Sequence, residues 1–297
     1  MDQELAAEFD GFEKEYESVR SRAGLIDLSF RGRLKVSGKD RVSFLHRLLS
    51  VDIKNLKSGE CITGCFLTGT AKIQCLLDVY AGEDALWIDT HESKAAHVAE
   101  LFEKFHFNED VNFEDVTGEY AEIAVEGPDS DSWRGHFSGD IVMAKSISGE
   151  KGFRVWCLPS KALPGIPWVG FKALETLRLE AGEPYFGIDI TDATLQPETG
   201  RDDWASTTKG CYAGQEIIQR VRNFGHPSRL LVKLETDTAG DLRGAKILSD
   251  GSEAGVITSS AFSPRSGKTV ALGYVAYDKR NNPKFEINGA KAVISER

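Results

Sequence analysis

The sequence predicts an α+β protein that ends in a small β-barrel, and two observations carry this prediction. Over about the first 220 residues, stretches with helical apolar spacing enclose strand-like runs, an order typical of sheets with helices on one face. After Phe224, short strand-like runs are separated by turn signals such as Asp250-Gly251 and Asn288-Gly289. Regular short strands of this kind are typical of a compact barrel or sandwich.

The first α+β unit opens with a predicted amphipathic helix, in which Leu5, Phe9, Phe12 and Tyr16 recur at helical spacing. Strand-like alternation and further helical spacing follow in the order strand, helix, strands, helix. We expect strands at 33–37, 61–67, 73–80 and 85–89, and helices at 42–49 and 92–106.

A second, similar unit follows. Its clearest element is a helix over 171–181, because Gly182 supplies a C-cap and Pro184 prevents the helix from continuing. The other expected elements are strands at 122–126 and 153–158 and a helix at 129–137.

The change of pattern after the second unit indicates a domain boundary. We expect residues 1–225 to form two α+β domains with discontinuous boundaries, and residues 226–297 to form the β-barrel domain.

Composition excludes several classes of protein. The chain has 297 residues and a net charge of −10, which argues against general nucleic-acid binding, since that needs clustered Lys and Arg. It has no apolar stretch long enough for a membrane span and no signal-peptide pattern, so we expect a cytoplasmic protein without membrane contact. Motifs of serine hydrolases, zinc enzymes and dinucleotide-binding folds are absent.

The segment 209–220 holds the most chemistry in the chain. Gly210 and Gly214 bracket Cys211, which predicts a tight loop leading into a helix. Cys211 then lies beside Lys209 and close to the positive end of that helix, and both favour a reactive thiolate. We therefore assign Cys211 and Lys209 as candidate catalytic residues.

The other four cysteines sit in apolar, strand-like surroundings and are interpreted as small buried hydrophobic residues. With Cys211 the chain has five cysteines, which are an odd number, are widely spaced and include no CxxC pair. This pattern argues against a disulfide framework and against a metal site. The four other cysteines are Cys61, Cys65, Cys75 and Cys157.

Arg178 lies on the apolar stripe of the 171–181 helix. A buried arginine must meet a carboxylate or line a cavity, because an unpaired buried charge is too costly. Two interpretations stay open: a structural ion pair, or a site that binds an anion.

The 209–220 segment closely resembles the signature K-G-C-[FY]-x-G-Q-E-x-x-x-[KR] of YgfZ-type proteins, a branch of the folate-binding aminomethyltransferase (glycine-cleavage T-protein) superfamily. Stretches at 22–29, 148–153, 177–182, 186–189 and 271–275 resemble the same superfamily in the same order. The residues that fit the signature are Lys209, Gly210, Cys211, Tyr212, Gly214, Gln215, Glu216 and Arg220.

The resemblance implies a three-domain ring, in which two α+β domains and the barrel surround a folate pocket. It implies tetrahydrofolate or a one-carbon derivative as cofactor, with Arg178, Glu150 and Tyr212 as folate-binding residues. It further implies iron–sulfur enzymes as client proteins, and a functional motif cysteine.

One departure separates two hypotheses of function. Aminomethyltransferases carry acidic residues in a segment like G-G-I-x-D-D-L, whereas Cys75 and Leu76 stand there in this chain, and Asp78 follows later. Methylene transfer needs charge and proton handling near the folate nitrogens. We therefore favour a folate-binding accessory protein for iron–sulfur cluster assembly or repair. The alternative is a folate-dependent aminomethyltransferase of one-carbon metabolism.

Overall fold

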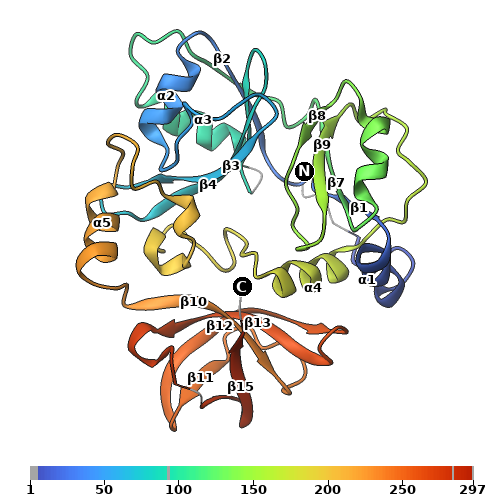
Figure 1. Cartoon of the computed structure of the whole chain (residues 1–297), viewed down its shortest axis with the longest axis vertical. Helices are drawn as coiled ribbons and strands as arrows, with labels where there is room; N and C mark the ends of the chain where they lie inside the picture. The colour runs from blue at the N-terminus through green and yellow to red at the C-terminus, as the bar shows by residue number, and fades with distance from the viewer. Residues whose placement is uncertain (1–5, 92–93, 283, 296–297) are drawn as a thin grey trace.

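Three groups of strands divide the chain into three lobes (Figure 1). The computed structural model describes residues 6–91, 94–282 and 284–295. Within these residues, two open sheets form the upper lobes of Figure 1 and a closed barrel forms the lower one. The predicted α+β class with a C-terminal barrel is confirmed.

The first lobe contains a five-stranded antiparallel sheet in the order β3-β4-β5-β2-β6. Its helices pack on one face, where Phe44 of α2 and Phe102 of α3 meet Leu77 and Val79 of β4 in one apolar core. The predicted helix start at 92–93 lies outside the described residues. The elements are β2 (Arg33–Ser37), α2 (Arg41–Leu48), β3 (Cys61–Leu67), β4 (Ile73–Ala81), β5 (Leu86–Asp89), α3 (Ala95–Glu103) and β6 (Asn112–Asp115).

The second lobe contains a four-stranded antiparallel sheet in the order β1-β7-β9-β8. Its elements are α1 (Phe12–Ser21), β1 (Gly24–Asp27), β7 (Ala121–Glu126), the 3₁₀ helix η1 (Ser130–Phe137), β8 (Ile141–Met143), β9 (Gly152–Cys157) and α4 (Phe171–Ala181).

Two expectations for the N-terminal region are wrong. The first helix belongs to the second lobe, because Tyr16 and Val19 of α1 share a core with Leu174 and Leu177 of α4. That helix begins at Phe12, later than the apolar spacing suggested, and Leu5 lies outside the described residues. The short strands β1, β6 and β8 were not predicted, since each has four residues or fewer.

The segment after α4 returns to the first lobe before it enters the barrel. The Ile73 N–H donates to the Thr194 carbonyl at 3.0 Å, and the Gln196 N–H to the Ala71 carbonyl at 2.9 Å, so this segment lies against the turn between β3 and β4. Its elements are the 3₁₀ helices η2 (Gln196–Thr199) and η3 (Asp202–Trp204), followed by α5 (Gln215–Phe224) at the left edge of Figure 1.

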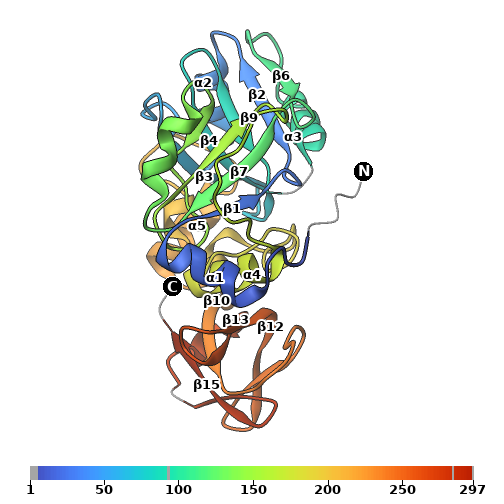
Figure 2. The same cartoon turned by 90° about the vertical axis from the view of Figure 1, so that its right-hand side faces the viewer.

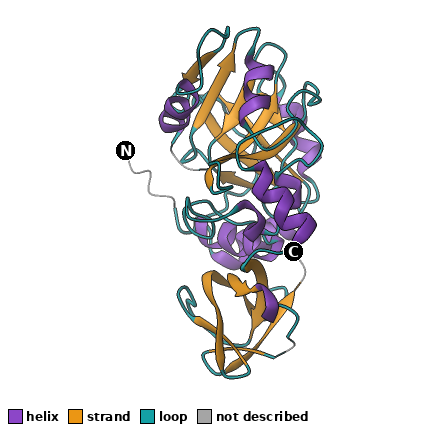
Figure 3. Cartoon of the chain, turned by 90° about the vertical axis from the view of Figure 1, so that its left-hand side faces the viewer, coloured by secondary structure: helices purple, strands orange, loops and turns teal. Residues whose placement is uncertain are grey.

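The barrel closes in the order β10-β13-β12-β11-β14-β15 around its own apolar core. Its strands form the lower part of Figure 3. Helices α1 and α4 of the second lobe lie between the barrel and the open sheets (Figure 2). None of the described helices is long and apolar enough to cross a bilayer. The barrel elements are β10 (Arg229–Thr236), β11 (Lys246–Ser249), β12 (Ser252–Ser263), β13 (Lys268–Ala276), η4 (Tyr277–Lys279), β14 (Phe285–Ile287) and β15 (Ala290–Ser295).

Candidate functional site

Lys209 contacts the C-terminal end of α2, where a helix leaves backbone carbonyls without partners. Its buried ammonium group donates to the carbonyls of His46 and Leu49, and to that of Val51 at 3.3 Å. An ammonium group has three donors, so these contacts use all of them. Burial lowers the pKa of Lys209 to about 8, which leaves it mostly charged at pH 7. The expectation that Lys209 serves the Cys211 thiol therefore does not match its contacts.

Tyr212 and Gln215 hold the motif loop in place. The Tyr212 hydroxyl donates to the Ser206 carbonyl at 2.9 Å, and its ring is buried in a core that includes Trp204 and Ile218. The Gln215 side-chain amide donates to the Lys209 carbonyl at 3.4 Å. With its hydroxyl and its ring both used inside the protein, Tyr212 is a structural residue in this conformation.

Gly214 is required by the shape of the loop. It has φ +79°, and a Cβ atom there would lie 2.7 Å from Ala71 Cα and 2.8 Å from the Thr68 carbonyl oxygen. The motif loop therefore packs directly on the turn between β3 and β4. The predicted helix after the loop is confirmed as α5.

The remaining motif residues face solvent. Cys211 is exposed, whereas Cys65, Cys75 and Cys157 are buried as expected and Cys61 is only partly buried. A Cβ atom at Gly210 would have no neighbour within 4 Å, so the fold itself does not require glycine there. Glu216 and Arg220 are exposed on α5 and line a shallow depression of about 540 Å³.

Arg178 forms the structural ion pair that the sequence left open. Its guanidinium group is fully buried and forms a two-bond pair with Glu175, at 2.8 and 2.7 Å. It also donates to Asp189 Oδ2 at 2.9 Å and to the Glu183 carbonyl at 3.0 Å. Asp189 in turn accepts hydrogen bonds from hydroxyl groups of the barrel. Arg178 therefore links α4 to the barrel, and its guanidinium nitrogens are engaged within the protein instead of being held ready for folate.

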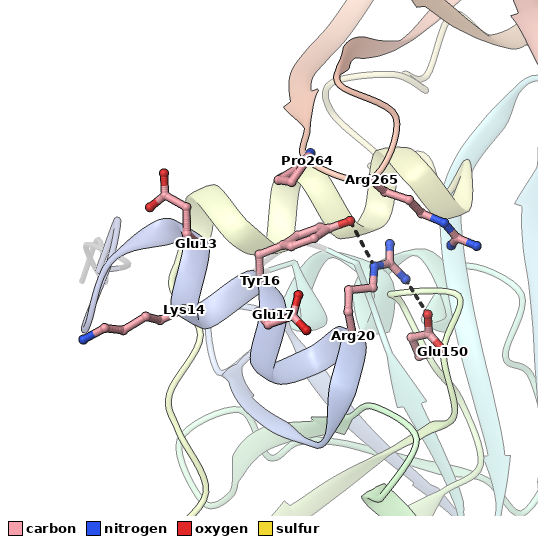
Figure 4. A pocket seen from close by; sticks show the side chains of 8 residues that line it. All are labelled: Glu13, Lys14, Tyr16, Glu17, Arg20, Glu150, Pro264 and Arg265. Carbon is pink, nitrogen blue, oxygen red and sulfur yellow. Dashed lines mark hydrogen bonds and ion pairs between the residues drawn. The ribbon is translucent and has the colours of Figure 1, made fainter.

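Glu150 lies at the edge of a cavity of about 760 Å³ between α1, the turn before β9 and the barrel (Figure 4). Its carboxylate pairs with Arg20 at 2.8 Å. Arg20 also pairs with Glu180 of α4. Arg178, Glu150 and Tyr212 thus lie in three different settings, and the structure does not bring them together as one ligand site.

The structure does gather charged side chains between the two open sheets, and no sequence pattern predicts this cluster. Arg154 of β9 pairs with Asp78 of β4 at 3.1 Å and with Asp89 of β5 at 2.8 Å. Arg31 donates to Asp89 Oδ1 at 2.7 Å, and Lys145 pairs with Asp78 at 2.6 Å. We call this group, together with Arg33, His91 and Glu122, the central cluster.

Many polar atoms of the central cluster lack hydrogen-bond partners among the described residues. They include Nη1 and Nη2 of Arg31, Nε and Nη1 of Arg33, Nε of Arg154, Nδ1 of His91 and both carboxyl oxygens of Glu122. Nε2 of His91 lies 3.3 Å from Asp78 Oδ2. Buried polar groups in native proteins are nearly always hydrogen-bonded, and the exceptions frequently mark a site for a ligand or ion. Donors and acceptors together suit a polar, planar ligand.

Burial shifts the protonation of this cluster in both directions. Burial, followed by the charge of Asp89, raises the pKa of Glu122 well above its usual value. Burial, followed by the charge of Arg31, lowers the pKa of His91 to about 4. Burial alone would raise the pKa of Asp78, but nearby charges, above all Lys145, hold it well below its usual value. The cluster thus holds four Arg and Lys side chains against three carboxyl groups, and burial favours the neutral form of Glu122.

The positions where aminomethyltransferases carry acids are apolar here. Cys75 packs in the core between the first sheet and its helices, and Leu76 packs in the core that includes Tyr212. The carboxylates that the two sheets bring to the centre are Asp78, Asp89 and Glu122. Within the described residues, no group of His, Cys, Asp or Glu side chains is arranged to hold a metal ion.

Two protein-family models match the chain, one over its N-terminal part and one over its C-terminal barrel. Residues 3–147 match the family model of the GCVT N-terminal domain. Residues 229–294 match that of the glycine cleavage T-protein C-terminal barrel domain. The second match covers the strands of the observed barrel from Arg229 onward.

Similar proteins extend this finding along the chain. An aminomethyltransferase of Rubrobacter xylanophilus is 29% identical in an alignment that covers 99% of this chain and 85% of the relative. One from Geobacillus kaustophilus is 27% identical and covers 93% of this chain and 85% of the relative. The crystal structure of the glycine cleavage system aminomethyltransferase T from Bartonella henselae shares the fold, with a TM-score of 0.85 at 24% identity over 96% of this chain and 88% of that one. The chain therefore combines a GCVT N-terminal domain with a glycine cleavage T-protein C-terminal barrel domain, and it is similar to aminomethyltransferases over nearly its whole length.

Proposed function

We propose that this protein binds tetrahydrofolate and acts in folate-dependent one-carbon transfer of the aminomethyltransferase type. The relatives named aminomethyltransferase support the reaction type, since they align over nearly the whole chain. The observation that carries ligand binding is the central cluster, whose buried donors and acceptors lack partners. A reduced folate has a planar ring with donors and acceptors and an anionic tail, which fits a buried site with excess positive charge.

A second candidate is an accessory protein for iron–sulfur enzymes that binds folate without transferring its one-carbon group. Two observations favour it. Leu76 and Cys75 place apolar side chains where transfer chemistry needs a carboxylate. Cys211 is exposed on a loop whose neighbours Lys209, Tyr212 and Gly214 are all held by packing, so the thiol is presented to other molecules.

Titration of the purified protein with tetrahydrofolate under reducing conditions tests the shared part of both candidates. We expect saturable binding of one ligand per chain by calorimetry. A matched variant is Glu122→Gln, which keeps the shape of the side chain but replaces its carboxyl group inside the central cluster. A control is Glu114→Gln, whose carboxylate lies in a half-exposed pair with Lys35. Absence of binding to the wild type would reject the proposal.

A reconstituted glycine-cleavage assay separates the two candidates. A transferase forms methylene-tetrahydrofolate from the aminomethylated lipoyl carrier protein, and Asp78→Asn lowers the rate because it removes an ionised carboxylate of the central cluster. An accessory protein forms none, yet restores the activity of iron–sulfur enzymes in a deletion strain. In that case Cys211→Ala fails to restore it, whereas Cys157→Ala, at a buried thiol, does. Full restoration by Cys211→Ala would exclude a role for the thiol.

A further inference from the structure

Tyr185 has a buried hydroxyl group close enough to the central cluster for the charges of Arg31 and Arg154 to act on it. Tyr185 lies just beyond α4, and 8% of the residue is exposed. Among the described residues, none forms a hydrogen bond with its hydroxyl group. Burying a hydroxyl group without a partner costs free energy, so this atom calls for an explanation.

Arg31 has free donors in the same region. Its side chain is fully buried between the two open sheets, and Nε donates to Asp89 Oδ1 at 2.7 Å. Nη2 lies 3.6 Å from Asp78 Oδ2, beyond hydrogen-bond distance, and neither Nη1 nor Nη2 has a hydrogen-bond partner among the described residues. The two terminal nitrogens form the fork with which a guanidinium group binds carboxylate or carbonyl oxygens.

The surroundings make Tyr185 a hydrogen-bond donor. Burial raises the pKa of Tyr185 to about 12, even though the charges of Arg178, Arg31 and Arg154 act to lower it. The hydroxyl group therefore keeps its proton at pH 7. Its ring is held in place by Arg178, whose guanidinium carbon lies 4.3 Å from the ring centroid. Arg178 thus fixes the tyrosine while each of its three guanidinium nitrogens forms a hydrogen bond with another residue.

We propose that the Tyr185 hydroxyl and the terminal nitrogens of Arg31 both donate hydrogen bonds to oxygen acceptors of the same ligand, a carbonyl or a carboxylate oxygen in each case. Both groups are donors, both are buried, and they lie in or near the central cluster, which holds more Arg and Lys side chains than carboxyl groups. This inference rests on the proposed function, because the ligand is taken to be a reduced folate. Tyr185 and Arg31 are then binding residues that the sequence patterns did not single out.

The substitution Tyr185→Phe tests this assignment with little disturbance of the fold. It removes only the hydroxyl group and keeps the ring on Arg178. We expect the Kd for tetrahydrofolate to rise about tenfold, the usual effect of losing one hydrogen bond in a buried site. The urea midpoint of the ligand-free protein should stay the same or increase, because a buried hydroxyl without a partner has been removed.

The control is Tyr274→Phe, at a buried hydroxyl group of the barrel that donates to the Asp189 carbonyl at 2.9 Å. Here we expect the opposite result, a lower urea midpoint with an unchanged Kd. A Tyr185→Phe variant with lower stability and unchanged affinity would overturn the proposal, since the hydroxyl group would then have a structural partner.

Two fragments of the ligand identify the half of it that Tyr185 binds. Tetrahydropterin keeps the ring carbonyl and lacks the carboxylates, whereas p-aminobenzoylglutamate keeps the amide carbonyl and the carboxylates and lacks the pterin ring. Weaker binding of either fragment to Tyr185→Phe than to wild type supports the proposal and names that half. If the wild type binds tetrahydrofolate and Tyr185→Phe binds it equally well, this inference fails and the proposed function stands. If the wild type does not bind tetrahydrofolate, both fail.

Discussion

Lys209 shows how a motif residue with a chemical interpretation can have a structural role. Its position beside Cys211 in the chain suggests that it activates the thiol, yet its ammonium group lies on the carbonyls at the end of α2. The carbonyl groups that Lys209 contacts lie far earlier in the chain, since His46 is 163 positions away. No local pattern in the sequence encodes such a contact.

The substitution Lys209→Met tests this role. We expect the free energy of unfolding to fall by about 2 kcal/mol, because the carbonyls at the end of α2 lose a charged donor. The alkylation rate of Cys211, followed by mass spectrometry to separate it from the buried thiols, should not change. Lys72→Met, at an exposed lysine on the turn between β3 and β4, is the control for both measurements. A large drop in the alkylation rate at unchanged stability would instead show that Lys209 activates the Cys211 thiol.

At the scale of elements, the glycines of the sequence predict the loop before α5. Only the structure shows that Gly214 and Gly210 have different roles in that loop. Gly214 adopts a left-handed conformation against the turn between β3 and β4, whereas Gly210 lies in open space. The sequence pattern placed both in a tight loop, since glycine permits many conformations. Which of them is required depends on a turn that lies far away in the sequence.

The pair Gly214→Ala and Gly210→Ala measures this difference. We expect Gly214→Ala to lower the free energy of unfolding by at least about 2 kcal/mol, because its Cβ atom meets backbone atoms of Ala71 and Thr68 in a strained conformation. Gly210→Ala should change it by less than about 0.5 kcal/mol. Urea unfolding of both variants gives the comparison, and equal losses would contradict the loop geometry.

At the scale of the whole molecule, the central cluster joins the two open sheets, and the barrel shares an apolar core with the segment that holds the motif loop. Leu231 and Tyr274 of the barrel pack in that core with Trp204 and Ile218. We propose residues 225 and 226 as the boundary between the folate-binding region and the barrel domain. The second open sheet takes β1 from the N-terminal region, so its lobe is discontinuous in the sequence.

His91 gives the central cluster a measurable pH dependence. Its pKa is about 4 in the folded protein and about 6.5 in an unfolded chain, so between these values the unfolded state binds the additional proton. Stability is therefore lost as the pH falls through this window. From pH 7 to pH 5 the loss due to His91 is about 2 kcal/mol.

The variant His91→Asn should remove this part of the pH dependence, and asparagine tolerates the positive φ of 31° at this position. Urea unfolding at pH 7 and pH 5 measures the difference, with His97→Asn on the exposed side of α3 as control. An unchanged difference between the two pH values in His91→Asn would show that the histidine is not buried as described.

The sequence by itself determined the α+β class, the C-terminal barrel, most helices and strands, and the resemblance to aminomethyltransferases. These follow from periodicity, turn residues and a specific motif, all of which are local in the chain. Only the tertiary structure decided that Arg178 pairs with Asp189 and Glu175, and that Arg31 and Tyr185 carry free donors in or near the central cluster. The partner of a buried charge is set by which lobes pack together, and that packing brings distant residues into contact.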